Sequence, residues 1–403
     1  MAKRRREGSS EKRCDCGKQR RKHLYLVLDD WDKGFSIHKL DALSFLDDSD
    51  DDGGGTLRRL PDPPAVRITE ARHSPMLFAG LGTTIFVANK EQRSPQVTGA
   101  LIYDTETAAM AMGPGLPENP CCVFVAVGRG RSKNDKGRKI EAPRCVSSHR
   151  RFRNDEKLYT LAKVDHGDRS NHLSGHLMGV AVHALSWARS PAAVAEPWLP
   201  SHEWAWESVA APMAPFDGNE ETVVSYAVHP DGHTIFFSTR GRGWRPAGTY
   251  SFDTEQREWR SHGDWMLPFD GQGYYERELD AWVGLHKDGY ICCCQAATAT
   301  PGAAPEWRKT ERKLFREGDR ERHLGATLTY MGNNVFCLVE SVVQEAVEPG
   351  RAYGAGRGCA LHVTVFGLKY NRDGELQSTV RRITNSYAVC KYIPGFTHEA
   401  FWM

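Results

Sequence analysis

The chain contains two copies of one residue pattern, and this internal repeat constrains its fold more than any other feature. In the first copy, Thr84-Ile-Phe-Val87 is followed by Gly99-Ala-Leu-Ile-Tyr-Asp-Thr-Glu106. In the second copy, Thr234-Ile-Phe-Phe237 is followed by Gly248-Thr-Tyr-Ser-Phe-Asp-Thr-Glu255. Each copy then runs on to a Leu-Pro pair. A pattern that recurs along one chain is typical of folds that stack similar units.

Each copy predicts a unit of short antiparallel strands, because apolar residues with helical spacing are nearly absent after the first 55 residues. The apolar run forms one strand, a hairpin reverses it, and a second strand ends at the Asp-Thr pair. The carboxylate and hydroxyl of that pair can cap backbone amides. A further strand, which contains Trp259 in the second copy, lies outermost. Four such strands cannot bury both faces alone, so neighbouring units must stack.

Fainter copies of the unit occur elsewhere in the chain. Strand-like runs begin at Leu158, Gly289 and Val335 and lead to further apolar or aromatic runs. An opening hairpin, formed by the runs Leu24–Leu28 and Phe35–Leu40, brings the total to about six units.

The last strand-like run, Tyr387–Tyr392, has no partner of its own. Pairing with the opening hairpin would close the units into a ring and remove two exposed sheet edges. We therefore predict an all-β fold, a β-propeller of about six four-stranded antiparallel blades, with the ring closed by pairing of N- and C-terminal strands. Two packed β-sandwiches are the alternative.

The distribution of charge and apolar residues indicates where the predicted domain begins and where charged segments flank or interrupt it. The first 22 residues carry ten basic and three acidic side chains and almost no apolar ones, so we expect a disordered basic tail over residues 1–22. The predicted propeller spans residues 23–393, and a C-terminal tail spans residues 394–403. Charged loop insertions are expected near residues 47–55, 128–157 and 163–178.

The composition excludes several classes of protein. Hydrophobic residues make up 40% of the chain and aromatic ones 10%, which is enough for a core and excludes wholesale disorder. The net charge of +2 excludes a uniformly basic nucleic-acid coat. Eleven cysteines, an odd number that includes the run Cys292–Cys294, argue against a disulfide framework. With no apolar run of membrane-spanning length and no secretory segment, we expect an intracellular protein in the nucleus or cytoplasm, without membrane contact.

Three phrases of the sequence carry a family resemblance. They stand at His233–Phe236, Tyr250–Thr254 and Leu279–His286. The pattern resembles the kelch-like and F-box-associated propellers of plants, and most of all an uncharacterised grass-type group, over Leu24 to Tyr392. The kelch Gly-Gly doublet and an F-box-like helical segment are missing. The resemblance implies a propeller and no established activity.

Motifs for catalysis or metal binding are weak. Cys14-Asp-Cys16 has the wrong spacing for a zinc half-site. The cluster of Asp165, His166, Asp168, His172 and His176 lacks the helical spacing and the glutamate of zinc proteases. Neither a Gly-x-Ser-x-Gly elbow nor a phosphate-binding loop occurs. We expect no catalytic residues, no cofactor and no metal.

The insertion at residues 128–157 carries eleven basic and four acidic side chains, which could contact an acidic partner or nucleic-acid phosphates. A solvated charged loop is the plainer interpretation, and Phe152 is its only aromatic residue, which argues against base stacking. The candidate partner-binding residues are Arg129, Arg131, Lys133, Lys136, Arg138, Lys139, Arg150, Arg151 and Arg153.

Seven tryptophans recur along the units: Trp187, Trp204, Trp206, Trp259, Trp265, Trp282 and Trp307. Because they recur at corresponding points, we assign them to packing between blades rather than to a sugar platform.

The sequence favours a monomeric, non-catalytic propeller that binds a protein partner through its loop face. One alternative is a nuclear protein that associates with nucleic acid through the basic tail and the 128–157 loop. Another is a propeller enzyme with a central pocket. That enzyme would require side chains such as Asp165, His166 and His176 to converge at the mouth of the channel.

Overall fold

A computed structural model describes residues 21–41, 57–69, 76–89, 99–128, 156–165, 178–190, 202–242, 248–296, 304–315, 321–393 and 395–403. The described residues form strands, turns and short 3-10 helices, with no α-helix among them, and they include no helix long and apolar enough to cross a membrane. The 3-10 helices η1 and η4 span Trp31–Lys33 and Pro349–Arg351.

The first twelve strands, in chain order, are β1 (Leu24–Asp29), β2 (Phe35–Leu40), β3 (Val66–Ile68), β4 (Met76–Leu81), β5 (Thr84–Asn89), β6 (Ala100–Asp104), β7 (Met110–Gly113), β8 (Pro120–Gly128), β9 (Glu156–Asp165), β10 (Met178–Arg189), β11 (His202–Ser208) and β12 (Glu221–Val228).

The remaining strands are β13 (Thr234–Gly241), β14 (Gly248–Asp253), β15 (Glu258–Gly263), β16 (Asp270–Glu276), β17 (Ala281–Leu285), β18 (Ile291–Gln295), β19 (Trp307–Lys309), β20 (His323–Gly332), β21 (Val335–Val343), β22 (Gly354–Tyr370), β23 (Leu376–Lys391) and β24 (Glu399–Trp402).

The strands assemble into six antiparallel groups of four, which confirms the predicted all-β propeller. We name them blade 1 (β24-β1-β2-β3), blade 2 (β4 to β7), blade 3 (β8 to β11), blade 4 (β12 to β15), blade 5 (β16 to β19) and blade 6 (β20 to β23). Blades 4 and 5 form one continuous eight-stranded sheet, because their first strands β12 and β16 pair in parallel.

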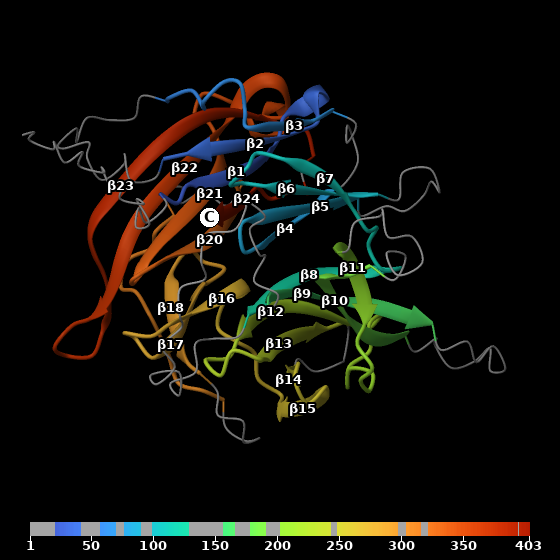
Figure 1. Ribbon diagram of the computed structural model, residues 1–403. Coiled ribbons are helices and arrows are strands. Elements are labelled where there is room, and N and C mark those ends of the chain that lie inside the picture. Colours follow the sequence, from blue (N-terminus) through green and yellow to red (C-terminus); the bar gives the residue numbers. More distant parts are fainter. Residues whose placement is uncertain are drawn as a thin grey trace, which may run out of the picture.

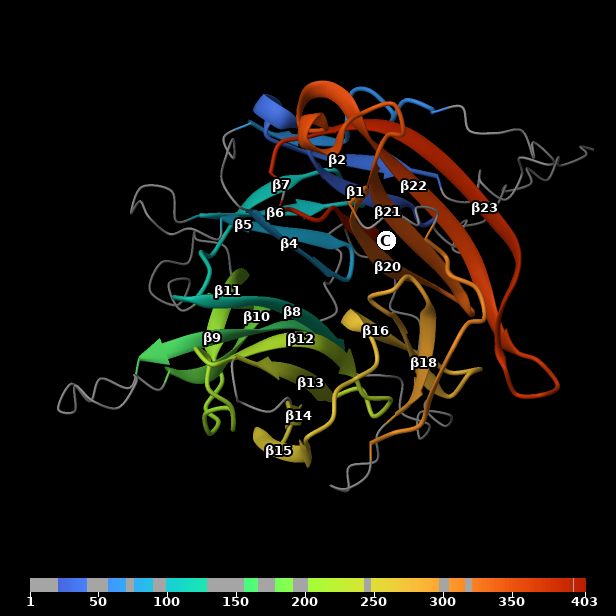
Figure 2. The same ribbon diagram turned by 180° about the vertical axis from the view of Figure 1, so that it is seen from behind.

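The first strand of each blade lies towards the centre of the molecule. Contacts join β4 to β8, β8 to β12, β12 to β16, and β20 to β24. Figures 1 and 2 show the blades following one another around this centre, with β24 close to it. As β12 and β16 run in parallel, the first and third turns of blades 4 and 5 lie on the same face of the propeller. We call it the hairpin face.

Strand β24 corrects two expectations from the sequence. Residues 399–402, placed in a C-terminal tail, form a strand that pairs antiparallel with β1. The run Tyr387–Tyr392, expected to pair with the opening hairpin, instead lies mostly in β23, which pairs with β22. Tyr387 nevertheless forms an isolated bridge with Arg58, so this run does lie beside the N-terminal segment.

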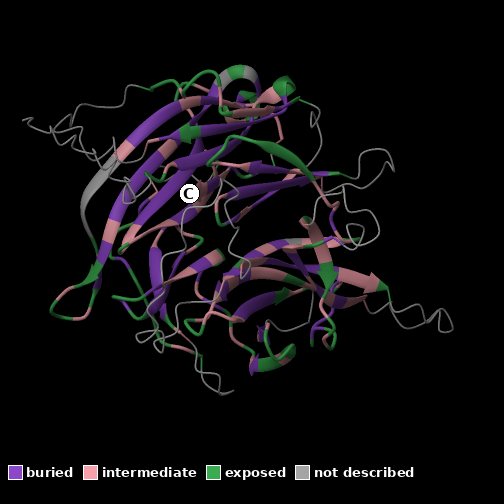
Figure 3. Ribbon diagram, in the orientation of Figure 1, coloured by how far each residue is buried: buried purple, intermediate pink, exposed green. Residues whose placement is uncertain are grey.

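Six clusters of buried apolar side chains lie between adjacent blades, one at each junction, including the junction of blade 6 with blade 1. The Thr-Ile-Phe-Phe pattern explains why. Successive side chains of a strand face opposite ways, so Phe236 packs towards blade 5 while Ile235 and Phe237 pack towards blade 3. In Figure 3 burial follows the strands, and exposed residues gather at turns and outer strands.

The Asp-Thr turns of the repeat have the same structure in both copies. Asp104 accepts a hydrogen bond from the amide of Glu106 at 2.8 Å, and Asp253 accepts one from the amide of Glu255 at 2.9 Å. This confirms capping by the carboxylate. The threonine hydroxyl, expected to cap an amide, instead donates to a carbonyl of the neighbouring hairpin turn, as Thr254 does to His233 at 2.7 Å. Each motif therefore joins two turns of one blade.

Candidate functional site

A groove of about 680 Å³ opens on the hairpin face at the junction of blades 4, 5 and 6. Its walls come from four turns and the strand ends beside them. The first turn of blade 4 supplies His229 and Pro230, and the first turn of blade 5 supplies Leu279 and Asp280. The remaining lining residues are Ala281, Cys293, Gln295, Ala296, Glu306, Trp307, Arg308, Tyr370 and Gly374.

Trp307 gives the groove its main apolar surface. It begins the outer strand β19, pairs in register with Cys294 and leaves 47% of its surface exposed. Its indole ring stacks on the imidazole of His286, with ring centroids 6.1 Å apart and an interplanar angle of 13°. The assignment of all the tryptophans to packing between blades is therefore wrong for Trp307, whereas Trp282 is fully buried as expected.

Arg308 and Tyr370 connect the groove to blade 6. The Arg308 guanidinium donates to the carbonyl oxygen of Gly374, in the turn between β22 and β23. Tyr370, 37% exposed, comes from the end of β22. Burial, together with the neighbouring Cys293 thiol, raises the pKa of the Tyr370 hydroxyl to about 12. The phenol therefore stays neutral, and its hydroxyl is hydrogen-bonded to the Cys293 thiol.

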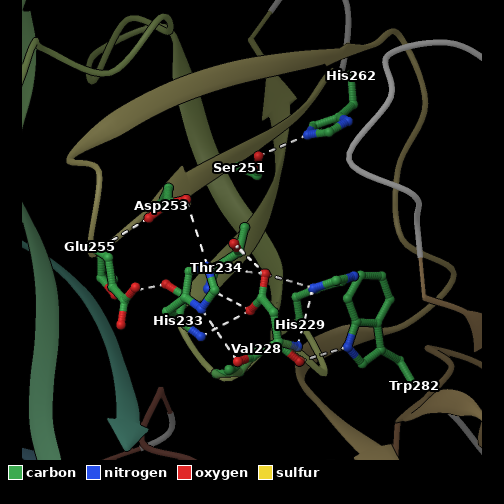
Figure 4. A network of polar contacts seen from close by, with 11 residues as sticks. Val228, His229, His233, Thr234, Ser251, Asp253, Glu255, His262 and Trp282 are labelled. Carbon is green, nitrogen blue, oxygen red and sulfur yellow. Dashed lines mark hydrogen bonds and ion pairs between the residues drawn. The ribbon is translucent and has the colours of Figure 1, made fainter. Parts of the chain in front are cut away.

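A polar network fixes the turn of blade 4 that borders the groove (Figure 4). His229 Nδ1 lies 2.9 Å from Asp231 Oδ2, and the Thr234 hydroxyl donates to the same oxygen at 2.7 Å. Burial disfavours ionisation of Asp231, but hydrogen bonds from His229, His233 and Thr234 outweigh it and hold the pKa of the carboxyl well below its usual range. The Trp282 indole donates to the Val228 carbonyl at 2.8 Å and anchors the start of the turn to blade 5.

The hydrogen bonds of this network support the turn. Within the described ranges, no group of three or more His, Cys, Asp and Glu side chains is placed to hold a metal ion. The Asp231 carboxylate also accepts hydrogen bonds from the amides of His233 and Thr234, both at 2.9 Å, so its oxygens are already engaged.

The described cysteines are poor nucleophiles. Cys292, Cys293, Cys294, Cys337 and Cys359 are buried, and Cys121 and Cys390 are partly so. Burial raises the pKa of Cys293 and Cys294 to about 12. A thiol that stays protonated at neutral pH neither attacks a substrate nor binds a metal readily.

A second cavity, of about 420 Å³, lies at the centre of the propeller and is lined by the first strands of all six blades. Glu399 of β24, Tyr226 of β12 and Tyr274 of β16 contribute ionisable groups to it. Reasoning from the sequence missed these three residues. The one available signal was an acidic residue directly before the apolar run Ala400–Met403.

The site residues proposed from sequence lie elsewhere or outside the described ranges. The nine basic candidates of the 128–157 insertion are outside, as are His166, Asp168, His172, His176, Cys14 and Cys16. Asp165 ends β9, is exposed and does not line the central cavity. His23 is described, and its amide donates to the Met403 carbonyl at 2.6 Å.

Comparison with known proteins gives a family and a set of distant structures. A family model described as "Protein of unknown function (DUF1668)" matches residues 21–387. No curated protein matches the chain.

Similar solved structures include a structural genomics protein of unknown function from Bacteroides thetaiotaomicron, with 10% identity and a TM-score of 0.38, covering 92% of this chain and 69% of that one. A protein from Lactobacillus plantarum has 8% identity and a TM-score of 0.36, with coverage of 94% and 99%. The Dos1 propeller has 9% identity and a TM-score of 0.32, with coverage of 92% and 90%. Similarity this low bears on neither ligand nor activity.

Proposed function

The chain belongs to the DUF1668 family, whose function is unknown, and we propose that it is a non-catalytic propeller that binds a protein partner on its hairpin face. One observation carries the proposal: the 680 Å³ groove that places an exposed Trp307 beside Arg308 and Tyr370. Tryptophan, tyrosine and arginine are the residue types that dominate the binding energy of protein interfaces.

The chemistry of the groove indicates an extended polypeptide segment as its ligand. Trp307 offers a flat apolar surface, Gln295 an amide, and Asp280 and Glu306 carboxylates. Such a mixture suits a backbone with an apolar or basic side chain, because the groove can satisfy both the peptide groups and the side chain.

The basic insertion supports the same face. The insertion joins β8 to β9, and Glu156 lies at its C-terminal end. Glu156 lies next to the first turn of blade 2, because one of its carboxylate oxygens is only 2.9 Å from the position that a Cβ atom on Gly82 would take. Gly128 and Glu156, the described residues that flank the insertion, therefore lie on the side of the hairpin face. We expect the insertion to steer an acidic partner by long-range attraction, which makes association faster at low salt.

The kinship with kelch-like and F-box-associated plant propellers is part of this proposal, as are a nuclear or cytoplasmic location and a monomeric state. Nucleic acid remains the competing ligand for the insertion at 128–157, and salt-dependent binding of a DNA or RNA probe that deletion of this insertion abolishes would favour it.

The test compares three baits in quantitative affinity purification from the native cell: the unchanged chain, Trp307→Ala and Met112→Ala. Met112 is the matched control, because it is 72% exposed on β7 of blade 2, away from the groove. We expect at least one protein to be retained by the unchanged chain and the control and lost by Trp307→Ala. Its purified form should bind Trp307→Ala at least about tenfold more weakly.

Folding is verified separately, and Glu306→Lys serves as a second groove variant because its side chain is exposed. If all baits recover the same proteins, or if the lost protein binds purified Trp307→Ala normally, the groove is not the recognition site.

A further inference from the structure

The central cavity is distinct from the groove, and the two share no lining residue. Its position on the propeller axis follows from its walls, which come from β4, β8, β12, β16, β20 and β24. A volume of about 420 Å³ falls within the usual range for small-molecule sites.

The wall of this cavity is aromatic and acidic. Seven aromatic residues contribute to it: Phe78, Phe124, Tyr226, Tyr274, Tyr330, Phe401 and Trp402. Two carboxylates, Asp270 and Glu399, also face it. Among the described residues that line the cavity there is no lysine, arginine or histidine. Asp270 is paired with Arg240 outside the wall, at 3.9 Å, so Glu399 is the carboxylate without a cationic partner.

Glu399 lines the cavity from the side of blade 1. It stands on β24 in blade 1, while Tyr226 and Tyr274 stand on the first strands of blades 4 and 5. The negative charge of Glu399 nevertheless acts on both hydroxyls and contributes to raising their pKa. No hydrogen bond to the Glu399 carboxylate is formed by the described residues.

Tyr226 and Tyr274 line the cavity from blades 4 and 5, and contacts hold Tyr274 in place. The Tyr274 hydroxyl donates to the Leu328 carbonyl at 3.1 Å, which holds its ring in place. The rings of Tyr274 and Tyr330 lie 6.2 Å apart with an interplanar angle of 33°. An aromatic surface near an unpaired carboxylate attracts a cation in two ways. The ring quadrupole attracts it, and so does the negative charge of the carboxylate.

We propose that the central cavity binds an organic ammonium ion, with Glu399 as its counter-ion and Tyr226 and Tyr274 as its aromatic wall. An inorganic divalent cation fits less well, because calcium requires six to eight oxygen ligands and no group of three acidic, His or Cys side chains is placed for a metal in the described chain. An alkylammonium group requires a single counter-charge and an aromatic wall, and the cavity offers both.

Binding depends on the ionisation of Glu399. Burial raises the pKa of this carboxyl to about 8, so it is mostly protonated at pH 7 in the free protein. The other titratable groups that face it are Tyr226 from β12, Asp270 and Tyr274 from β16, and Tyr330 from β20, while β4 and β8 contribute none. Burial also raises the pKa of all three of these tyrosines, which therefore stay neutral. A bound cation stabilises the ionised carboxylate, so binding should tighten from pH 7 to pH 9 and release about one proton per ligand at pH 7.

The experiment is titration calorimetry of the full chain with choline, tetramethylammonium and 3,3-dimethyl-1-butanol, the uncharged isostere of choline. We expect saturable binding of both cations, and binding of the isostere at least about tenfold weaker. Glu399→Gln should weaken choline binding at least about tenfold, and Tyr226→Leu should also weaken it. Repeating the titration in two buffers of different ionisation enthalpy measures the released proton.

Glu258→Gln is the matched control, because Glu258 is exposed on β15 and does not line the cavity. Circular dichroism confirms that each variant is folded. Four results overturn the proposal: no saturable binding of either cation at millimolar concentration, equal affinity for the isostere, affinity unchanged by Glu399→Gln, or calcium binding without choline binding. Each leaves the groove proposal untouched, because that proposal rests on Trp307.

Discussion

Replacing Glu399 by glutamine should stabilise the protein, and the gain should grow with pH. The carboxyl lies in the central cavity without a cationic neighbour in the wall, and burial raises its pKa from 4.5 to about 8. The folded state therefore prefers the neutral acid. A preference for the neutral form favours folding fully below pH 4.5, and this contribution is lost as the pH rises through 8. Glutamine keeps the shape of the side chain and cannot ionise.

The magnitude follows from the same two pKa values. Relative to the unchanged chain, Glu399→Gln should gain less than about 1 kcal/mol at pH 5, about 3 kcal/mol at pH 7 and about 5 kcal/mol at pH 9. These are upper limits, because the carboxylate is partly exposed to the cavity and water there reduces the cost of its charge. Even half of the value at pH 9 is a large part of the 5–15 kcal/mol typical of a folded domain.

Urea denaturation at pH 5, 7 and 9, followed by tryptophan fluorescence, measures the effect. The comparison includes the exposed Glu258→Gln, for which the free energy of unfolding should differ little from that of the unchanged chain at every pH. Equal slopes with urea concentration across the variants would show that the transitions are comparable. If the gain of Glu399→Gln is the same at pH 5 and pH 9, or if this variant is less stable at pH 9, the carboxyl is not held in its neutral form and the reasoning fails.

Three further predictions test the fold. Asp253→Ala leaves the amides of Glu255 and Gln256 without their partner and should lower the free energy of unfolding by about 1–3 kcal/mol. The equivalent Asp104→Ala should lower it less, because the turn at Asp104 is more exposed. Urea denaturation of both variants measures the difference. Deletion of residues 399–403 removes β24 and should abolish the cooperative unfolding transition in calorimetry. A shortened chain that still unfolds cooperatively would show that blade 1 is stable without β24. Thiols such as Cys293 should not react with Ellman's reagent at pH 8 in the native protein but should react in urea, and rapid native modification of Cys293 by mass spectrometry would contradict its burial.

The repeat could be predicted from the sequence because its determinants are local. An Asp followed by Thr fixes a turn through hydrogen bonds to residues two or three positions away, as at Asp253. A run of consecutive apolar residues, such as Ile235–Phe237, marks a strand covered on both faces. The position of β24 could not be predicted in this way. Four residues carry little pattern, and their partner β1 lies at the other end of the sequence.

The exposure of Trp307 could not be predicted from the sequence either. Trp259 and Trp307 stand on equivalent outer strands, β15 and β19. Trp259 packs edge-on against Phe216, with ring centroids 5.9 Å apart, and is also covered by Phe252. Trp307 has His286 on one side and the open groove on the other. Which tryptophan is covered depends on side chains that follow other strands, and the repeat itself does not encode them.

The pairing of β24 with β1 also sets an order of events during translation. Strands β1 to β3 leave the ribosome early, but the strand that completes their sheet is made only when residue 402 is reached. At ordinary rates of synthesis this interval lasts roughly 20 to 70 seconds. Throughout it, the inner edge of β1 lacks the strand that satisfies its amides and carbonyls. A nascent chain with such an edge is a natural client for chaperones, and late-acting ones should determine how much of this protein reaches its native state.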